Sequence, residues 1–97
     1  AMVTLETVHG KRGRLLDLAA RHGARNLRVF GSVARGEADV ASDVDLLVDL
    51  EPGRSLIDLG ALLVAIETEL GTRVDLVTEA GLRQALREQV PRDAVPL

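Results

Sequence analysis

The sequence predicts an α/β fold in which helices flank a small sheet, and two patterns carry most of that prediction. Residues 43–50 place an apolar side chain at every second position, which is the period of a strand with one buried face. Residues 56–70 repeat apolar side chains at intervals of three and four positions, which is the period of an amphipathic helix. Strands and helices that alternate along one chain are typical of helices layered on a sheet.

Signals of the same kind place the elements before residue 43. Residues 12–22 carry a helical apolar pattern that stops at Gly23, a residue that commonly ends helices. Residues 26–30 are short, rich in β-forming side chains, and run directly into Gly31. We therefore expect a first helix followed by a first strand. His9 is placed before that helix and His22 near its end, both as solvated or capping residues.

The central helix is predicted to begin at Ser55 and to end at Gly71. Ser55 is a favoured N-cap residue, and Asp58 occupies the capping-box position three residues later. Its main apolar stripe consists of Leu56, Leu59, Leu63, Ile66 and Leu70. A second group lies off that stripe and indicates either a second buried face, under the N-terminal helix, or an interface with a partner: Leu62, Val64 and Ala65.

The last elements are a third strand over 74–77 and a helix over 79–89. Thr78 is the expected cap of that helix, whose apolar positions are Leu82, Leu86 and Val90. These elements give about three strands in one layered domain. The length of 97 residues predicts that the domain spans 1–97, with Ala1 before Met2 taken as an expression scar.

Composition excludes several classes of function. The net charge is -3 and Phe30 is the only aromatic residue, so the chain lacks both the basic surface and the stacking platform that nucleic-acid binding uses. There is no cysteine, which excludes disulfides and thiolate metal sites. No apolar stretch approaches the ~20 residues that span a bilayer, and the N-terminal residues lack a signal-peptide pattern. We expect a cytoplasmic protein without membrane contact.

Three aspartates stand where strands are predicted. Asp43 and Asp45 point the same way on one strand and repel each other unless positive charge lies between them. Asp75 interrupts the short apolar strand over 74–77 and can complete the cluster if the two strands pair. Three carboxylates without cysteine suit Mg²⁺ or Mn²⁺. The alternative is that the aspartates lie on an ordinary solvent-exposed face of the strands, where Arg28 or Arg73 supplies the positive charge between them.

The pair Gly31-Ser32 directly follows the first strand. Glycine lets a ligand approach the backbone closely, and amides at the start of a helical turn, with the Ser32 hydroxyl, can bind a phosphate. Taken alone the pair is an ordinary turn. A P-loop is excluded because Glu37 stands where its lysine is required, and an EF-hand is excluded because Leu47 and Val48 occupy positions that need oxygen or glycine.

Gly31-Ser32, ten intervening residues, Asp43-Val44-Asp45 and the later Asp75 together resemble the signature of the DNA polymerase β-like nucleotidyltransferase superfamily. Within it, the chain's size and the string from Gly31 to Glu37 resemble the minimal nucleotidyltransferase (MNT) proteins, the antitoxin partners of HEPN-domain ribonucleases. The resemblance runs from the first helix to Val90 and implies the polymerase β-like fold with a small mixed sheet. Relatives commonly continue a few residues past Leu97, so a short closing segment is expected.

The resemblance implies residue roles. Asp43 and Asp45 would hold two Mg²⁺ ions, with Mn²⁺ as a substitute, and Asp75 would bind the catalytic metal and help activate the acceptor. Gly31 and Ser32 would cradle the β- and γ-phosphates. Two interpretations of Arg35 stand side by side: contact with phosphate or acceptor, or an ion pair with Glu37 or Asp39 that holds the turn. Where many relatives carry an acid before the Ser-Asp pair, this chain has Ala41, which concerns loop geometry.

The implied activity is Mg²⁺-dependent transfer of AMP from ATP to a hydroxyl, on a tyrosine of a cognate HEPN toxin. This adenylylation would make the chain an antitoxin, in a possible hetero-oligomer with the toxin. The second hypothesis is an antitoxin that neutralises the toxin by binding alone. Because all three acids are present, the sequence favours the enzyme.

Overall fold

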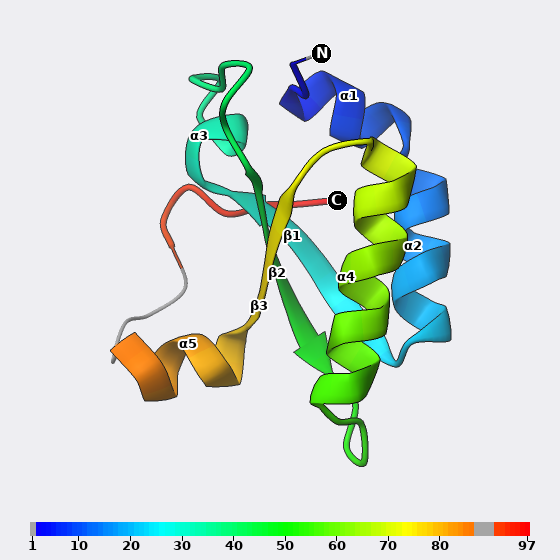
Figure 1. Ribbon diagram of the computed structural model, residues 1–97. Coiled ribbons are helices and arrows are strands. Elements are labelled where there is room, and N and C mark those ends of the chain that lie inside the picture. Colours follow the sequence, from blue (N-terminus) through cyan, green and yellow to red (C-terminus); the bar gives the residue numbers. More distant parts are fainter. Residues whose placement is uncertain (1, 87–90) are drawn as a thin grey trace.

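The computed structural model describes residues 2–86 and 91–97, apart from the side chains of residues 83–86. Short and long helices are arranged around a small sheet (Figure 1). In chain order the elements are α1 (Leu5–Gly10), α2 (Arg12–Arg21), β1 (Ala24–Phe30), α3 (Gly31–Ala34), β2 (Val44–Leu50), α4 (Leu56–Leu70), β3 (Val74–Thr78), α5 (Glu79–Leu86) and β4 (Val95–Pro96).

The described strands form a mixed sheet in the order β3-β2-β1-β4. β1 pairs antiparallel with both β2 and β4, and β2 pairs parallel with β3 through the crossover helix α4. The α/β class and the mixed sheet are therefore confirmed. The expected count of three strands was wrong, because β4 is only two residues long and contains Pro96. A strand so short has no alternation to reveal it.

One face of the sheet carries the apolar core. Side chains of β2 at Val44, Leu46 and Val48 are fully buried there, and helices α2 and α4 pack on this side (Figure 1). α5 lies on the other side of the sheet, against β2 and β3. The expected alternation over 43–50 is thus the physical reason that β2 has one apolar face and one polar face.

The expected ends of α4 are confirmed. The Ile57 amide donates to Ser55 Oγ at 3.2 Å, and the Ser55 amide donates to Asp58 Oδ2 at 2.9 Å. These two bonds complete the predicted capping box. Gly71 ends the helix in the left-handed conformation, at φ 68°, where glycine carries no side-chain penalty.

The predicted apolar stripe of α4 was partly wrong. Leu62, Ile66 and Leu70 are buried and follow one another at intervals of four residues, so they mark the face that meets the core. Leu56 in the first turn falls outside that face and is 80% exposed. Of the side chains predicted to lie off the stripe, Leu62 is buried, Ala65 is half-buried and Val64 is exposed.

Smaller expectations were also tested at the other elements. β1 starts at Ala24, before the predicted residue 26, and Asn26 takes a positive φ of 57° where the pairing register shifts. His9 is exposed and precedes α2, as expected, but it lies in the last turn of α1, a helix that sequence reasoning missed. His22 caps α2 as expected. Thr78 caps α5, because the Gly81 amide donates to Thr78 Oγ1 at 2.9 Å.

The final helix can be compared with its prediction only in part. α5 is described up to Leu86. The rest of the predicted range 79–89, together with Val90, lies outside the described residues. Within the described part of the chain, every helix is too short or too polar to cross a membrane.

Candidate active site

Asp45 and Asp75 lie side by side on the polar face of the sheet. They are register partners in the parallel pair of β2 and β3, and adjacent strands are about 4.8 Å apart. On its other side Asp45 is the register partner of Phe30, the last residue of β1. The chain turns into α3 directly after Phe30, so β1 delivers Gly31 and Ser32 to the same corner of the sheet.

Gly31 is in close contact with the Asp45 carboxylate. A Cβ at Gly31 would overlap Asp45 Oδ2, and the φ of Gly31 is 74°, a conformation that side chains rarely adopt. The backbone conformation therefore favours glycine here, and a side chain at this position would displace the Asp45 carboxylate. Through this contact the structure brings the Gly-Ser turn and one of the predicted acids together.

Asp43 stands just before β2 and leans toward an arginine. Arg73 Nε lies 3.9 Å from Asp43 Oδ1, with both side chains well exposed, and such exposed pairs contribute little stability. The Arg73 carbonyl also accepts a hydrogen bond from the Val44 amide at 3.1 Å. Of the two arginines considered as neighbours of the acids, Arg73 therefore reaches Asp43.

Arg28, the other arginine considered, forms ion pairs with two different acids. Its side chain is buried and contacts Asp49 Oδ1 at 3.1 Å and Glu79 Oε2 at 3.5 Å. Its Nε also donates to the Asn26 carbonyl at 2.8 Å. The alternative in which Arg28 supplies the positive charge for Asp43 and Asp45 was wrong, because Asp49 and Glu79 hold its guanidinium elsewhere on the same face.

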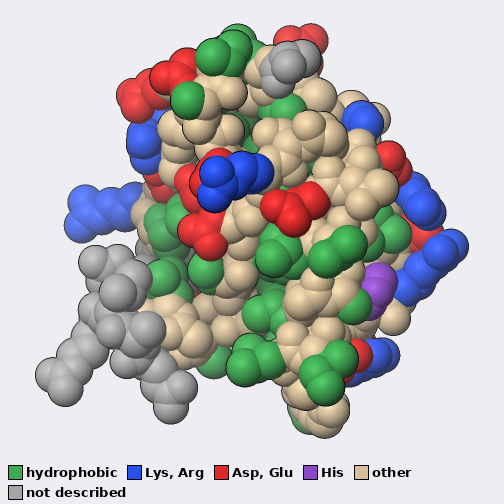
Figure 2. Space-filling view, viewed as in Figure 1, with side chains coloured by type: hydrophobic (Ala, Val, Ile, Leu, Met, Phe, Trp, Pro, Cys, Tyr) green, Lys and Arg blue, Asp and Glu red, His purple; other side chains and the backbone are tan. Residues whose placement is uncertain are grey.

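Negative charge is concentrated around Asp45. Partial burial, and then the charges of Asp75 and Asp43, raise the pKa of Asp45, while the nearby Arg35 opposes the shift. Figure 2 shows Asp and Glu side chains gathered on both sides of Lys or Arg side chains near the middle of one face. A cation at this corner would relieve the repulsion that raises this pKa.

The donor set at this corner fits a hard divalent cation. Aspartate oxygens are the ligands that Mg²⁺ and Mn²⁺ prefer, and burial with like-charge crowding at Asp45 is the electrostatic condition that a cation relieves. Among the described residues, however, no three His, Cys, Asp or Glu side chains are already placed to hold a metal ion. Asp43, which points to Arg73, would have to turn toward Asp45 and Asp75.

Arg35 forms two ion pairs at the end of α3. Its Nε donates to Glu37 Oε2 at 3.0 Å, and its Nη1 donates to Asp93 Oδ2 at 2.6 Å. Both hydrogen bonds raise the pKa of Arg35. The predicted pairing with Glu37 is confirmed. The alternative partner, Asp39, was wrong because its carboxylate accepts from Ala41 N and Ser42 Oγ within its own turn.

Asp93 is the residue at this corner that sequence reasoning missed. It influences the pKa of Asp45 and contacts Arg35, although 58 positions separate it from that arginine. Only the pairing of β4 with β1 brings the two together. No local pattern marks Asp93, since it follows Pro91 in a short turn without periodic side chains.

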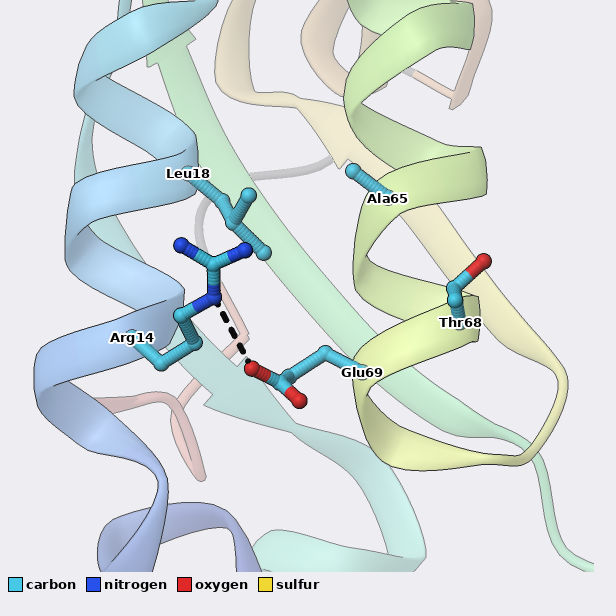
Figure 3. Close-up of a pocket in the computed structure, with 5 residues that line it drawn as sticks. All are labelled: Arg14, Leu18, Ala65, Thr68 and Glu69. Atoms are coloured by element: carbon cyan, nitrogen blue, oxygen red, sulfur yellow. Dashed lines mark hydrogen bonds and ion pairs between the residues drawn. The ribbon is translucent and has the colours of Figure 1, made fainter.

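A separate hollow lies between α2 and α4, on the core side of the sheet (Figure 3). It measures about 300 Å³ and is lined by Arg14, Leu18, Ala65, Thr68 and Glu69. Arg14 Nε donates to Glu69 Oε1 at 3.0 Å across it. None of the predicted site residues lines this hollow, and its ion pair joins the two helices.

The chain is similar to known nucleotidyltransferases over almost its whole length. The model of the nucleotidyltransferase domain family matches residues 14–96. Protein adenylyltransferase MntA of Thermococcus cleftensis is 43% identical over 98% of this chain and 97% of its own length. A provisionally named protein adenylyltransferase of Methanocaldococcus jannaschii is 34% identical over 84% of this chain and 88% of its own length.

Two solved structures share the fold. One, provisionally named a minimal nucleotidyltransferase, has a TM-score of 0.84 and 57% identity over 98% of this chain and 97% of its own. The other is a toxin–antitoxin crystallised with AMP-PNP. It has a TM-score of 0.71 and 22% identity, over 87% of this chain and 69% of its own.

Proposed function

The chain belongs to the nucleotidyltransferase domain family and is a nucleotidyltransferase; on that premise we propose that it transfers AMP from ATP to a hydroxyl group of a partner toxin. The observation that carries the proposal is the corner where Asp45 packs on Gly31 and lies beside Asp75. This corner brings the Gly31-Ser32 turn next to two of the three acids whose spacing resembles the nucleotidyltransferase signature, which supports the proposal.

Each residue of this corner has a proposed role. Asp43, Asp45 and Asp75 hold Mg²⁺, which supplies the charge neutralisation that lets a triphosphate approach so many carboxylates. The Ser32 hydroxyl and the backbone that follows Gly31 bind the phosphates, because the first amides of a helical turn have no partner within the turn. Asp75 also accepts or orients the proton of the acceptor hydroxyl.

The proposed step is an in-line displacement. The acceptor oxygen forms a bond to the α-phosphorus of ATP while the bond from that phosphorus to the β-phosphate oxygen breaks. The hydroxyl proton is lost to Asp75 or to solvent, and pyrophosphate leaves. AMP remains on the acceptor as a phosphodiester.

The partner is proposed from the names of similar proteins. Two relatives are named protein adenylyltransferases, and a fold neighbour is a toxin–antitoxin structure with AMP-PNP. These names support a protein acceptor and an adenine nucleotide. We propose that the acceptor is a tyrosine of a HEPN ribonuclease, which the added AMP silences.

A second function is favoured by one feature of the surface. Leu56 and Ile57, at the start of α4, are more than three-quarters exposed. They adjoin an apolar groove of about 380 Å³ between α4 and α5, lined by residues that include Leu56, Leu76 and Leu82. Exposed apolar surface of this kind suits contact with another protein, so neutralisation of the toxin by binding alone is the alternative.

Intact-mass spectrometry of the partner separates the two functions. The protein encoded beside this chain is incubated with ATP, Mg²⁺ and either wild type or the double variant Asp43→Ala/Asp45→Ala. Adenylylation predicts a gain of one or more AMP units with wild type only. An unmodified partner that still forms a complex with wild type would identify the binding-only antitoxin.

A further inference from the structure

Arg35 is held by two acids of unequal exposure. The Glu37 side chain is 65% exposed, whereas that of Asp93 is 25% exposed. One oxygen of Asp93 accepts from Arg35 Nη1 at 2.6 Å, and the other is buried without a hydrogen-bond partner among the described residues. An ion pair that water reaches less is screened less. The contact with Asp93 therefore fixes the guanidinium more firmly than the contact with Glu37.

Asp93 itself is fixed by the edge of the sheet. Val95 and Pro96 pair with Val29 and Arg28 of β1, and the Leu97 amide donates to the Leu27 carbonyl at 3.0 Å. Upstream, the Ala94 amide closes a turn on the Pro91 carbonyl at 3.1 Å. The carboxylate is thus carried on backbone bound to β1, the strand that ends at Phe30, directly before Gly31.

Both members of the pair lie near the candidate site. Arg35 is the C-terminal cap of α3, the short helix that begins at Gly31. The charges of Arg35 and Asp93 both act on Asp45. With Nε and Nη1 bonded to the two acids, Arg35 keeps Nη2 free of hydrogen bonds to described residues. A guanidinium edge of this kind matches the oxygens of a phosphate.

We infer that Asp93 is a positioning residue that holds Arg35 in place to bind the triphosphate of the incoming nucleotide. The inference rests on the proposed function, since it requires a nucleotide at this corner. Asp93 acts on the nucleotide through Arg35, and it contacts neither nucleotide nor metal itself. Its removal would let the arginine move toward Glu37 and solvent.

The test is calorimetric titration with AMP-PNP and Mg²⁺ of wild type, Arg35→Ala, Asp93→Ala and the double variant. We expect Asp93→Ala to weaken AMP-PNP binding about tenfold, which is the loss of one well-placed charged contact. In the Arg35→Ala background the same substitution should change binding less than about twofold, because contacts that act as one unit are not additive. Mn²⁺ binding without nucleotide should change less than about twofold, because Asp93 contacts Arg35 and acts on Asp45 only as the weakest of its charged neighbours.

One further variant serves as a control and another as a substitute for Asp93→Ala. Asp17→Asn removes a carboxylate that pairs with Arg14 and Arg21 on α2, and it should bind AMP-PNP as wild type does. If Asp93→Ala does not fold, Asp93→Asn keeps the shape and removes the charge. It should weaken binding by about threefold, because a neutral acceptor forms a weaker bond to the guanidinium.

Three results would overturn the inference while wild type still binds AMP-PNP: unchanged or tighter binding by the Asp93 variants, an equal loss with and without Arg35, or a parallel loss of Mn²⁺ binding. Tighter binding would mean that Asp93 competes with phosphate, and lost Mn²⁺ binding that it ligates metal. If wild type itself binds no AMP-PNP, the proposed function fails and the inference falls with it.

Discussion

The two faces of β2 differ in character: one is apolar and packs in the core, and the other carries most of the charged side chains. Val44, Leu46 and Val48 point into the core beneath α2 and α4 and are fully buried. Asp45 and Asp49 alternate with them and point to the face that carries Asp75 and Arg28. Leu47 is the exception, because it lies on the charged face and is yet fully buried.

This difference shows that one face of the strand can stabilise the fold while the other carries the residues of the candidate site. Burial of the apolar face supplies most of the free energy of folding. The charged face holds the half-buried Asp45 beside the exposed Asp75, where the repulsion between their carboxylates opposes folding slightly and favours a cation. Substitutions on the two faces should therefore change stability and nucleotide transfer separately.

Asp75→Asn should reduce AMP transfer by roughly a thousandfold, since a carboxylate of a metal site contributes several kcal/mol to the transition state. Asp75 is exposed, so the melting temperature should not fall. Rates of AMP incorporation and circular dichroism melting curves are the measurements. A variant that loses its fold along with its activity would show that the two faces are not separate.

Ile66→Ala should lower the free energy of unfolding by about 2–5 kcal/mol, because Ile66 is fully buried in the core and its truncation leaves a cavity. Urea denaturation measures the change. At a temperature where the variant remains folded, its AMP-PNP affinity should equal that of wild type. A weakened affinity would mean that the core face also shapes the site.

Leu47→Ala should cost about 2 kcal/mol, the lower end of the range for buried leucines, since less apolar structure covers this face. Leu47 lies two residues after Asp45 on the same face of β2, so its truncation should also disturb Asp45 and weaken AMP-PNP binding. Urea denaturation and calorimetry test the two effects. Loss of stability alone would place Leu47 functionally with the core.

Asp45→Asn should raise the melting temperature of the metal-free protein at pH 7, and this is the smallest of the four effects. The pKa of Asp45 is raised by burial and by Asp75 and Asp43, so ionisation of Asp45 costs the folded state stability at neutral pH. Below the ordinary aspartate pKa of about 3.9, both states are protonated and the advantage should vanish. Melting curves from pH 3 to pH 7, without divalent ions, measure it; a gain that persists at pH 3 would assign the effect to packing.

Local patterns made much of the fold predictable. The alternation of β2, the capping box at Ser55 and the stop at Gly71 all depend on residues a few positions apart, and the structure confirms each. The start of β1 was missed because the bulge at Asn26 interrupts its alternation. The exposed start of α4 was missed because periodicity alone does not show where a helix meets its core.

Some residues of the candidate site could likewise be predicted from local sequence, and others could not. The acids and the Gly-Ser pair could be named from the sequence, because their spacing resembles a family signature. The neighbours of Asp45 could not all be named, since alternation does not distinguish parallel from antiparallel pairing, and only the parallel register sets Asp45 beside Asp75. Asp93 depends on a contact between distant segments and left no local sign.

The two-residue strand β4 also closes one side of the sheet. Without it, β1 would be an edge strand with free amides and carbonyls, which is a template for another chain to add a strand and aggregate. Pro96 has no amide hydrogen, so β4 presents few donors on its own outer side. In the described part of the chain, growth of the sheet by strand addition is therefore disfavoured at β4, and β3 is the edge where it could begin.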